Sequence, residues 1–379
     1  MYTMKIGIVT IHSAYNYGSA LQAVATCEAV NRIADISAEI IDYQPDDIME
    51  MYSLELKKNL KNTKALLKYL LTYRSRISKK QAFELFWRNV HCLSAKCYTT
   101  EEQLAAANNE YDGFILGSDQ VWNPDIVKSA FPVFCLDFVD KTKVKLSYAS
   151  SFGVKSIERD KLDYLNHRLE EFEAVSVRED QAKSLLSDVN QHKTTVVCDP
   201  VFLLSKEAWA EKVTEFPLPK EYILVYCVEQ DKTFREKIKK IGAKLGLAIV
   251  DIGTSANPRN YVGIHSDNVG PAEFLYAIQH AHYIITNSFH GTAFSIIFEK
   301  EFIVKAHTKR GLRMENLLER VNLKNRLVSG NETVDELIDH LQSQSLDDKD
   351  HILFDDYIQE SEKYLLNTLM RVTKNQYEH

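Results

Sequence analysis

Five side chains that could take part in chemistry lie directly after one apolar run of the sequence. The run is Phe114–Leu116, in the stretch YDGFIL, and the side chains beyond it are Ser118, Asp119, Gln120, Trp122 and Asn123. An indole flanked by amides is typical of a sugar site, because the ring can stack on the sugar while the amides bond its hydroxyl groups. Asp119 would then accept a proton from an attacking hydroxyl. A turn explains Ser118 and Asp119 but not the other three, so a site is favoured here.

A second candidate follows the first apolar run, MKIGIVTI, in the turn HSAYNYGS. Asn16, Tyr17 and Gly18 stand where a helix is expected to begin, and the unpaired N–H groups of a helix start can hold an anion. Asn16 and Ser19 could equally be ordinary turn and cap residues. The glycine spacing is not that of a dinucleotide-binding or phosphate-binding loop.

The stretch VSVRED places Arg178 at the end of a predicted strand. At such a position a guanidinium can bind a carboxylate or a phosphate through two parallel hydrogen bonds. The alternative is a salt bridge to Glu179 or Asp180 at the start of the following helix.

The fourth candidate is the stretch IITNSFHGTAF, in which Asn287 and Ser288 separate a strand pattern from an apolar helix. Ser288 can cap this helix, which places His290 and Gly291 in its first turn. We expect the His290 ring to act in the chemistry at the strand ends. Beyond the next strand, two arginines are expected to add positive charge for an anionic ligand: Arg310 and Arg313.

Other motifs are absent from the sequence. It contains no H-E-x-x-H, no G-x-S-x-G and no clustered metal ligands, so neither a metal nor another cofactor is expected. His280 and His282 flank a helix end and a strand start and are expected to be structural.

The four stretches depend on strands to position them, because ligands of open α/β sheets bind beyond the carboxyl ends of the strands. Short apolar runs alternate with helical patterns along the chain, which predicts parallel sheets. The alternation stops at the proline-containing stretch KVTEFPLPKE and restarts at YILVYCV. We therefore predict an α/β protein with two Rossmann-like domains facing a cleft. The N-terminal domain is expected at 1–210, on the acceptor side, and the C-terminal domain at 221–350, on the donor side. A C-terminal helix, 351–379, is expected to pack back on the first domain.

Residues 46–110 interrupt this rhythm and are expected to form a helical insertion in the first domain, without a strand. The segment 57–80 within it contains nine Lys and Arg residues and no acid, with leucines near helical spacing. Such a basic amphipathic pattern indicates a surface for an anionic membrane. A helical hairpin with a merely solvated basic face is the other interpretation that stays open.

Composition limits the class of protein. A chain of 379 residues favours two domains. Its 45% hydrophobic and 26% charged residues indicate a soluble globular protein, and its net charge of −7 argues against nucleic-acid binding. No apolar run approaches the ~20 residues of a membrane span, and the start lacks a signal-peptide pattern. Six scattered cysteines are expected to be reduced and buried. A cytoplasmic protein is expected, peripheral on the inner face of the membrane if 57–80 binds lipid.

With the four stretches in this order, the chain resembles the polysaccharide pyruvyl transferase family. The resemblance covers nearly the whole chain, and its specific parts are Gly-Ser-Asp-Gln-Val-Trp-Asn-Pro and Ser-Phe-His-Gly. It implies the two-domain fold of the B-type glycosyltransferases. It also implies transfer of the enolpyruvyl unit of phosphoenolpyruvate to a sugar of a capsule or exopolysaccharide, or of its lipid-linked precursor. The products would be a pyruvate ketal and phosphate, with phosphoenolpyruvate as donor substrate and no cofactor.

Carried onto this sequence, the resemblance makes Arg178 a ligand of phosphoenolpyruvate and His290 a catalytic or donor-binding residue. We assign His290 as the acid and Asp119 as the base. Many members have Arg-Leu-His where this chain has Ser-Phe-His, and Arg310 or Arg313 could supply the missing cation. Two alternatives stay open. One is a nucleotide-sugar-dependent glycosyltransferase with the same fold, and the other is a noncatalytic glycan-binding component of the same pathway.

Overall fold

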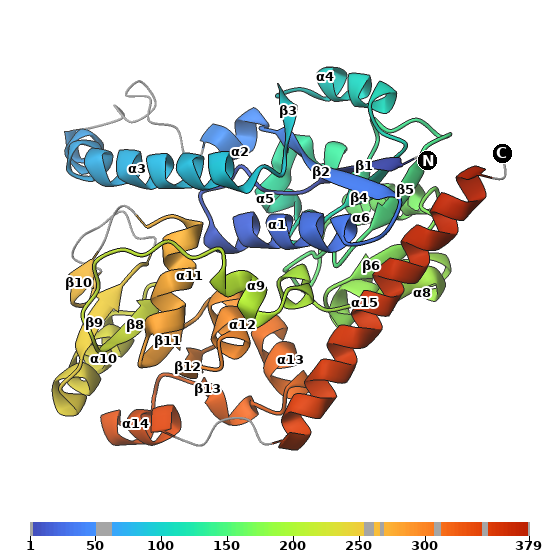
Figure 1. Ribbon diagram of the computed structural model, residues 1–379. Coiled ribbons are helices and arrows are strands. Elements are labelled where there is room, and N and C mark those ends of the chain that lie inside the picture. The colour runs from blue at the N-terminus through green and yellow to red at the C-terminus, as the bar shows by residue number, and fades with distance from the viewer. Residues whose placement is uncertain are drawn as a thin grey trace. The chain divides into compact units, whose positions relative to one another are not determined.

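The structure is a computed structural model that describes residues 3–50, 63–253, 261–265, 269–306, 312–342 and 348–377. Side chains are described over these ranges except at 63–72, 312, 348–353 and 375–377. The chain forms two compact units, and each is built on a parallel sheet with helices around it (Figure 1). Unit 1 comprises Met1–Tyr52, Val90–Leu204 and Asp355–His379, and unit 2 comprises Ser53–Asn89 and Ser205–Phe354. The predicted α/β class with parallel sheets is confirmed.

The sheet of unit 1 has the order β3-β2-β1-β4-β5, with all strands parallel. Two further strands, β6 and β7, pair with each other in a separate two-stranded sheet, and the single bridges Leu146–Ala174 and Ser150–Val177 connect it to the segment of β5. The strands are β1 (Met4–Val9), β2 (Ile36–Tyr43), β3 (Leu93–Tyr98), β4 (Gly113–Leu116), β5 (Val144–Ser147), β6 (Val175–Val177) and β7 (Thr194–Val196). Since the central strands are buried on both faces, they read as continuous apolar runs in the sequence.

The helices of unit 1 cover this sheet. They are α1 (Tyr17–Asn31), α2 (Asp46–Glu50), α4 (Glu101–Ala105), α5 (Pro124–Val127), α6 (Arg159–Leu169), α7 (Asp180–Leu185) and α8 (Asp188–Lys193), with the larger part of α15 (Asp348–Tyr377). Helix α1 is buried on nearly every side, which its apolar sequence without a polar stripe allows. Helix α15 contacts the segment after β7 through Ser361, whose Oγ accepts a hydrogen bond from the Cys198 N–H at 2.9 Å.

Unit 2 has the strand order β10-β9-β8-β11-β12-β13, again parallel throughout. Its strands are β8 (Tyr222–Tyr226), β9 (Ala248–Asp251), β10 (Ile264–His265), β11 (Tyr283–Thr286), β12 (Glu301–Lys305) and β13 (Leu327–Val328). Its helices are α3 (Thr63–Val90), which ends one residue beyond the unit, α9 (Lys206–Ala210), α10 (Lys232–Leu245), α11 (Pro271–His280), α12 (Phe289–Ile297), α13 (Leu312–Arg320) and α14 (Val334–Gln342).

The long helix α3 groups with unit 2 because its backbone lies against the start of α11. A Cβ placed on Gly270, the N-cap of α11, would come within 2.9 Å of the Ala82 carbonyl oxygen. This helix contains most of the basic segment 57–80. Residues 57–62 and the side chains of 63–72 lie outside the described part of the chain. Contact with a membrane therefore stays a prediction.

Two expectations about this region and the cysteines are corrected. The segment 46–110 was expected to contain no strand, but β3 lies within it and pairs with β2. As an edge strand with exposed residues it lacks the apolar run of a buried strand. All six cysteines are free, but Cys97, on this same strand, is exposed rather than buried.

Candidate functional site

The two central strands of unit 1 place the first two sequence stretches side by side. Strands β1 and β4 are neighbours, and the strand order reverses between them, since β2 lies beyond β1 and β5 beyond β4. Ligands of such sheets bind at the carboxyl ends of the strands where the order reverses. The loop after β1 leads to Asn16, and the loop after β4 leads to Ser118 and Asp119.

Asn16 caps the N-terminus of α1, which was the alternative to a role in binding an anion. Its Oδ1 accepts from the N–H groups of Gly18 at 2.9 Å and Ser19 at 3.3 Å. The amide of Gly18 is thus already paired in this structure, and Tyr17 is buried. Binding of a substrate by these three residues stays a prediction.

Asp119 is held firmly at the end of β4. Its backbone has a φ of 73°, in the left-handed region that a residue other than glycine enters only under constraint. One carboxylate oxygen accepts from Ser19 Oγ at 2.5 Å, and the other accepts from the Gln120 N–H at 2.8 Å. The carbonyl of Asp119 accepts from the Ser151 N–H at 3.0 Å. These bonds fix a buried carboxylate at the reversal point, and its role as a base stays a prediction.

The polar residues around Asp119 are bonded to one another. Ser118 Oγ donates to the Ala149 carbonyl at 2.9 Å. Asn123 caps α5 by accepting from the Asp125 N–H at 3.1 Å and donates to Gln120 Oε1 at 3.3 Å. Gln120 lies across Gly153, where a Cβ would meet its Oε1 at 2.2 Å. Contact of Gln120 and Asn123 with a sugar stays a prediction.

The expected stacking role of Trp122 is corrected. Its side chain has no exposed surface and belongs to the hydrophobic core of unit 1. The indole packs on Phe152 with ring centroids 5.4 Å apart. A tryptophan that buries both faces in the core cannot offer one to a sugar.

Arg178 follows β6 and lies in a buried group of opposite charges. Its Nη1 is 2.5 Å from Asp199 Oδ2, and its Nε is 3.6 Å from Glu179 Oε2. Burial by itself would lower the pKa of Arg178, but the charges of Asp199, Glu179 and Asp119 outweigh it and raise the pKa. The salt bridge weighed as the alternative is therefore present, with Asp199 as its nearer partner. Donor binding by Arg178 stays a prediction.

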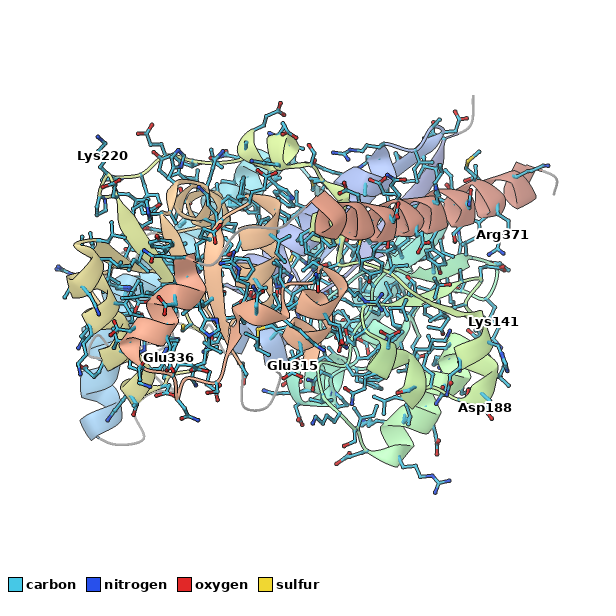
Figure 2. All side chains as sticks on the ribbon, turned by 90° about the horizontal axis from the view of Figure 1, so that it is seen from below. Lys141, Asp188, Lys220, Glu315, Glu336 and Arg371 are labelled. Atoms are coloured by element: carbon cyan, nitrogen blue, oxygen red, sulfur yellow. The ribbon has the colours of Figure 1, made fainter. Side chains whose placement is uncertain are left out.

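The charged side chains around Arg178 are buried, whereas other charged side chains of unit 1 lie on its surface. Lys141, Asp188 and Arg371 are exposed and project outward (Figure 2). Arg178, Glu179 and Asp199 are each less than 8% exposed. Buried charges are expensive and persist where they are paired or needed for chemistry.

In unit 2 the order of strands reverses between β8 and β11, and Asn287 joins the two loops there. Its Oδ1 accepts from the Val228 N–H at 2.7 Å, and its Nδ2 donates to the Glu229 carbonyl at 2.8 Å. Ser288 caps α12 by accepting from the Gly291 N–H at 3.4 Å. The cap that the sequence predicts is confirmed.

His290 lies in the first turn of α12, at this reversal point, and is 7% exposed. Its ring meets the Phe289 ring edge to face at 5.2 Å. Arg313, in the first turn of α13, places its guanidinium carbon 5.8 Å from the same Phe289 ring. Arg313 thus lies beside the turn that carries His290, whereas Arg310 lies outside the described residues. In unit 2 the structure therefore places His290 and Arg313 against the same Phe289 ring.

The comparison with protein families decides what kind of chain this is. A family model described as polysaccharide pyruvyl transferase matches residues 16–309, which is well over half of the sequence. The chain belongs to the polysaccharide pyruvyl transferase family. No curated protein matches it significantly.

Solved structures similar to this chain share its fold. They include a putative UDP-N-acetylglucosamine 2-epimerase from Listeria monocytogenes, with 11% identity and a TM-score of 0.55 over 99% of this chain and 97% of that one. A UDP-GlcNAc 2-epimerase from Neisseria meningitidis bound to UDP-GlcNAc has 12% identity and a TM-score of 0.54 over 97% and 100% of the two chains. The glycotransferase of kitacinnamycin has 12% identity and a TM-score of 0.51 over 99% of each. At such identities the likeness shows the fold alone, which confirms two Rossmann-like units of the B-type glycosyltransferase kind.

Three residues of the unit 1 site escaped the sequence analysis as functional candidates: Ser19, Glu179 and Asp199. The first two were seen only as a cap and a salt-bridge partner. Asp199 follows the strand pattern TTVVCD, so its place at a strand end was the available signal. Among the described residues, no three His, Cys, Asp or Glu side chains gather as metal ligands would. Within the same residues, no helix is both long and apolar enough to cross a membrane.

Proposed function

We propose that this pyruvyl transferase moves the pyruvyl unit of phosphoenolpyruvate onto a sugar of a surface polysaccharide or its lipid-linked precursor. One hydroxyl group of the sugar adds to the central carbon as the carbon–carbon double bond is protonated, and a second displaces the phosphate, so that this carbon becomes a ketal. One hydroxyl proton balances the proton gained by the methylene carbon, and the other leaves with the phosphate. Membership of the family supports this reaction class, and the position of His290 at the reversal point of unit 2 carries the assignment of the site.

The chemistry requires an acid and a base. Protonation of the enol carbon creates an oxocarbenium-like centre, and a histidine can supply that proton. We assign this step to His290. Asp119, whose carboxylate is oriented by Ser19 and by the Gln120 N–H, accepts the proton of the attacking hydroxyl. Arg178 and Arg313 are the described cations proposed to bind the carboxylate and phosphate of the donor.

A nucleotide-sugar-dependent glycosyltransferase is the second candidate, because one expected cation is missing. Where many members carry an arginine, this chain has Ser288, and its hydroxyl is used to cap α12. If phosphoenolpyruvate is nevertheless the donor, Arg313, Arg310 or helix N–H groups have to bind its phosphate in place of that arginine. Donor binding separates the two candidates.

Variants of the two assigned residues test the mechanism. His290→Ala and Asp119→Asn should each lower turnover by ~10²–10⁴ without unfolding the protein. Phosphate release from phosphoenolpyruvate is measured with a glycan acceptor that supports turnover by the wild type. His282→Ala, which changes an exposed histidine of the same unit, is the control and should retain full activity. Full activity in both His290→Ala and Asp119→Asn would rule out these roles.

A further inference from the structure

The strand ends of unit 1 carry more negative than positive charge. Arg178 lies within 4 Å of two carboxylates, at 2.5 Å from Asp199 and 3.6 Å from Glu179, and the charge of a third, Asp119, also acts on it. When all four groups are ionised, three negative charges and one positive charge leave an excess of two negative charges. All four side chains are at least nine-tenths buried, so water screens this excess only weakly.

The three carboxylates differ in how the fold uses them. Asp199 is fixed structurally, since its Oδ2 bonds Arg178 and its Oδ1 accepts from the Val201 N–H at 3.1 Å. Glu179 accepts from Ser151 Oγ at 2.5 Å through Oε1. Its Oε2 is buried and makes no hydrogen bond in the part of the chain that the structure describes, although it lies 3.6 Å from Arg178 Nε. Oε2 therefore meets Arg178 as an ion pair and not as a hydrogen bond among the described residues, an arrangement that is uncommon for a buried carboxylate oxygen and calls for a functional reason.

We propose that Glu179 sets the affinity of the enzyme for its anionic donor, by opposing with its charge the binding of phosphoenolpyruvate at Arg178. This inference rests on the proposed function, in which Arg178 binds the donor. Glu179 also opposes the binding of phosphate, the anionic product, and so favours product release. Repulsion between charges that share a poorly screened site is strong enough to change affinity by an order of magnitude.

The test is calorimetric titration of phosphoenolpyruvate into the full chain, which needs no acceptor. Glu179→Gln removes the charge but keeps the shape and an oxygen for Ser151, and it should bind phosphoenolpyruvate about tenfold more tightly, a gain of ~1.4 kcal/mol. Inorganic phosphate, with less charge, should gain less. Glu179→Asp keeps the charge and should stay near the wild type. Glu170→Gln makes the same change at an exposed position of unit 1 and should have no effect.

Unchanged or weaker binding by a folded Glu179→Gln variant would overturn the inference. If that variant does not fold, Asp119→Asn removes one charge from the same group and should tighten donor binding as well. An unchanged affinity in Asp119→Asn would then count against the inference.

A further variant separates this inference from the proposed function. Arg178→Lys keeps the positive charge that the three carboxylates need but loses the planar guanidinium. If it binds phosphoenolpyruvate as well as the wild type does, Arg178 is not a donor ligand, and both proposals fail at this site. If it binds more weakly while Glu179→Gln is not tighter, only the role of Glu179 fails. A wild type that does not bind phosphoenolpyruvate at all contradicts the proposed function itself.

Discussion

Asp119 combines a left-handed backbone with a carboxylate that is bonded through both oxygens. Strain of this kind costs ~1–3 kcal/mol and persists where the surroundings enforce it. Here the enforcing groups are Ser19 in the first turn of α1, Gln120 after β4 and Ser151 after β5. The sequence identified Asp119 because it follows a strand. It could not identify Ser19 as the partner, because contacts between residues 100 positions apart depend on the order of strands.

A pair formed by the buried His12 and the half-buried Asp42 gives a prediction about pH. His12 Nε2 lies 3.0 Å from Asp42 Oδ1, which links the loop after β1 to β2. Burial opposes ionisation of Asp42, but hydrogen bonds from His12 and Gln44 lower its pKa below the ordinary 3.8. A lowered pKa in the folded state means that Asp42 stabilises the fold above the pKa of the unfolded chain. This stabilisation is lost as the pH falls through the lowered value.

We therefore expect Asp42→Asn to reduce the free energy of unfolding at pH 7. The difference from the wild type should shrink as the pH falls below about 3.8, the ordinary value for the carboxyl. Urea unfolding at a series of pH values measures this, with Asp140→Asn at an exposed position of unit 1 as control. A difference that stays constant down to the acid limit would show that the ionised form of Asp42 has no special role.

At the scale of elements, the close approach of α12 to β11 gives another prediction. A Cβ on Gly291 would lie 2.4 Å from Thr286 Oγ1 and 3.0 Å from Tyr226 Cδ1. Thr286 cannot yield easily, because its hydroxyl donates to the Tyr226 carbonyl at 2.6 Å and accepts from the Ser288 N–H at 3.0 Å. Glycine thus allows the helix that carries His290 to start close to the sheet.

Gly291→Ala should lower the stability of the protein by ~1–3 kcal/mol, despite the better helix propensity of alanine. It should also lower turnover, since α12 has to move and His290 moves with it. Denaturant unfolding measures the first effect, and phosphate release measures the second. Wild-type stability and activity would show that the helix start is looser than the structure indicates.

The elements that the sequence predicted well are those with a single physical requirement. Central strands need apolar residues on both faces, so β1 and β8 are visible as apolar runs. The edge strand β3 needs few apolar residues, because much of it is exposed. Its residues LSAKCY therefore do not form an apolar run. Trp122 shows that the same holds for a single side chain. An indole near polar residues in the sequence is compatible with a sugar site and with a hydrophobic core. Only the packing of Phe152 against it decides between them.

For the whole molecule, the sequence contained enough to predict the α/β class, two Rossmann-like units and the family. These depend on repeated patterns and on two specific motifs, one in each unit. The charge balance at Arg178 could not be predicted, because Asp199 is 21 positions away and reaches it through the pairing of β6 with β7. The sequence therefore suggested an anion-binding arginine, with a salt bridge to Glu179 or Asp180 as the alternative, and did not reveal Asp199 as the nearest partner of Arg178.

The central claim is that the donor is phosphoenolpyruvate, and thermal unfolding tests it most directly. The midpoint is measured alone, with phosphoenolpyruvate and with a panel of nucleotide sugars, for the wild type and for Arg178→Lys. A ligand at ~100 times its dissociation constant adds ~2.7 kcal/mol, which raises the midpoint by several degrees. We expect this rise with phosphoenolpyruvate only, and a smaller rise in the variant. A rise with a nucleotide sugar and none with phosphoenolpyruvate would contradict it and would make this chain a glycosyltransferase.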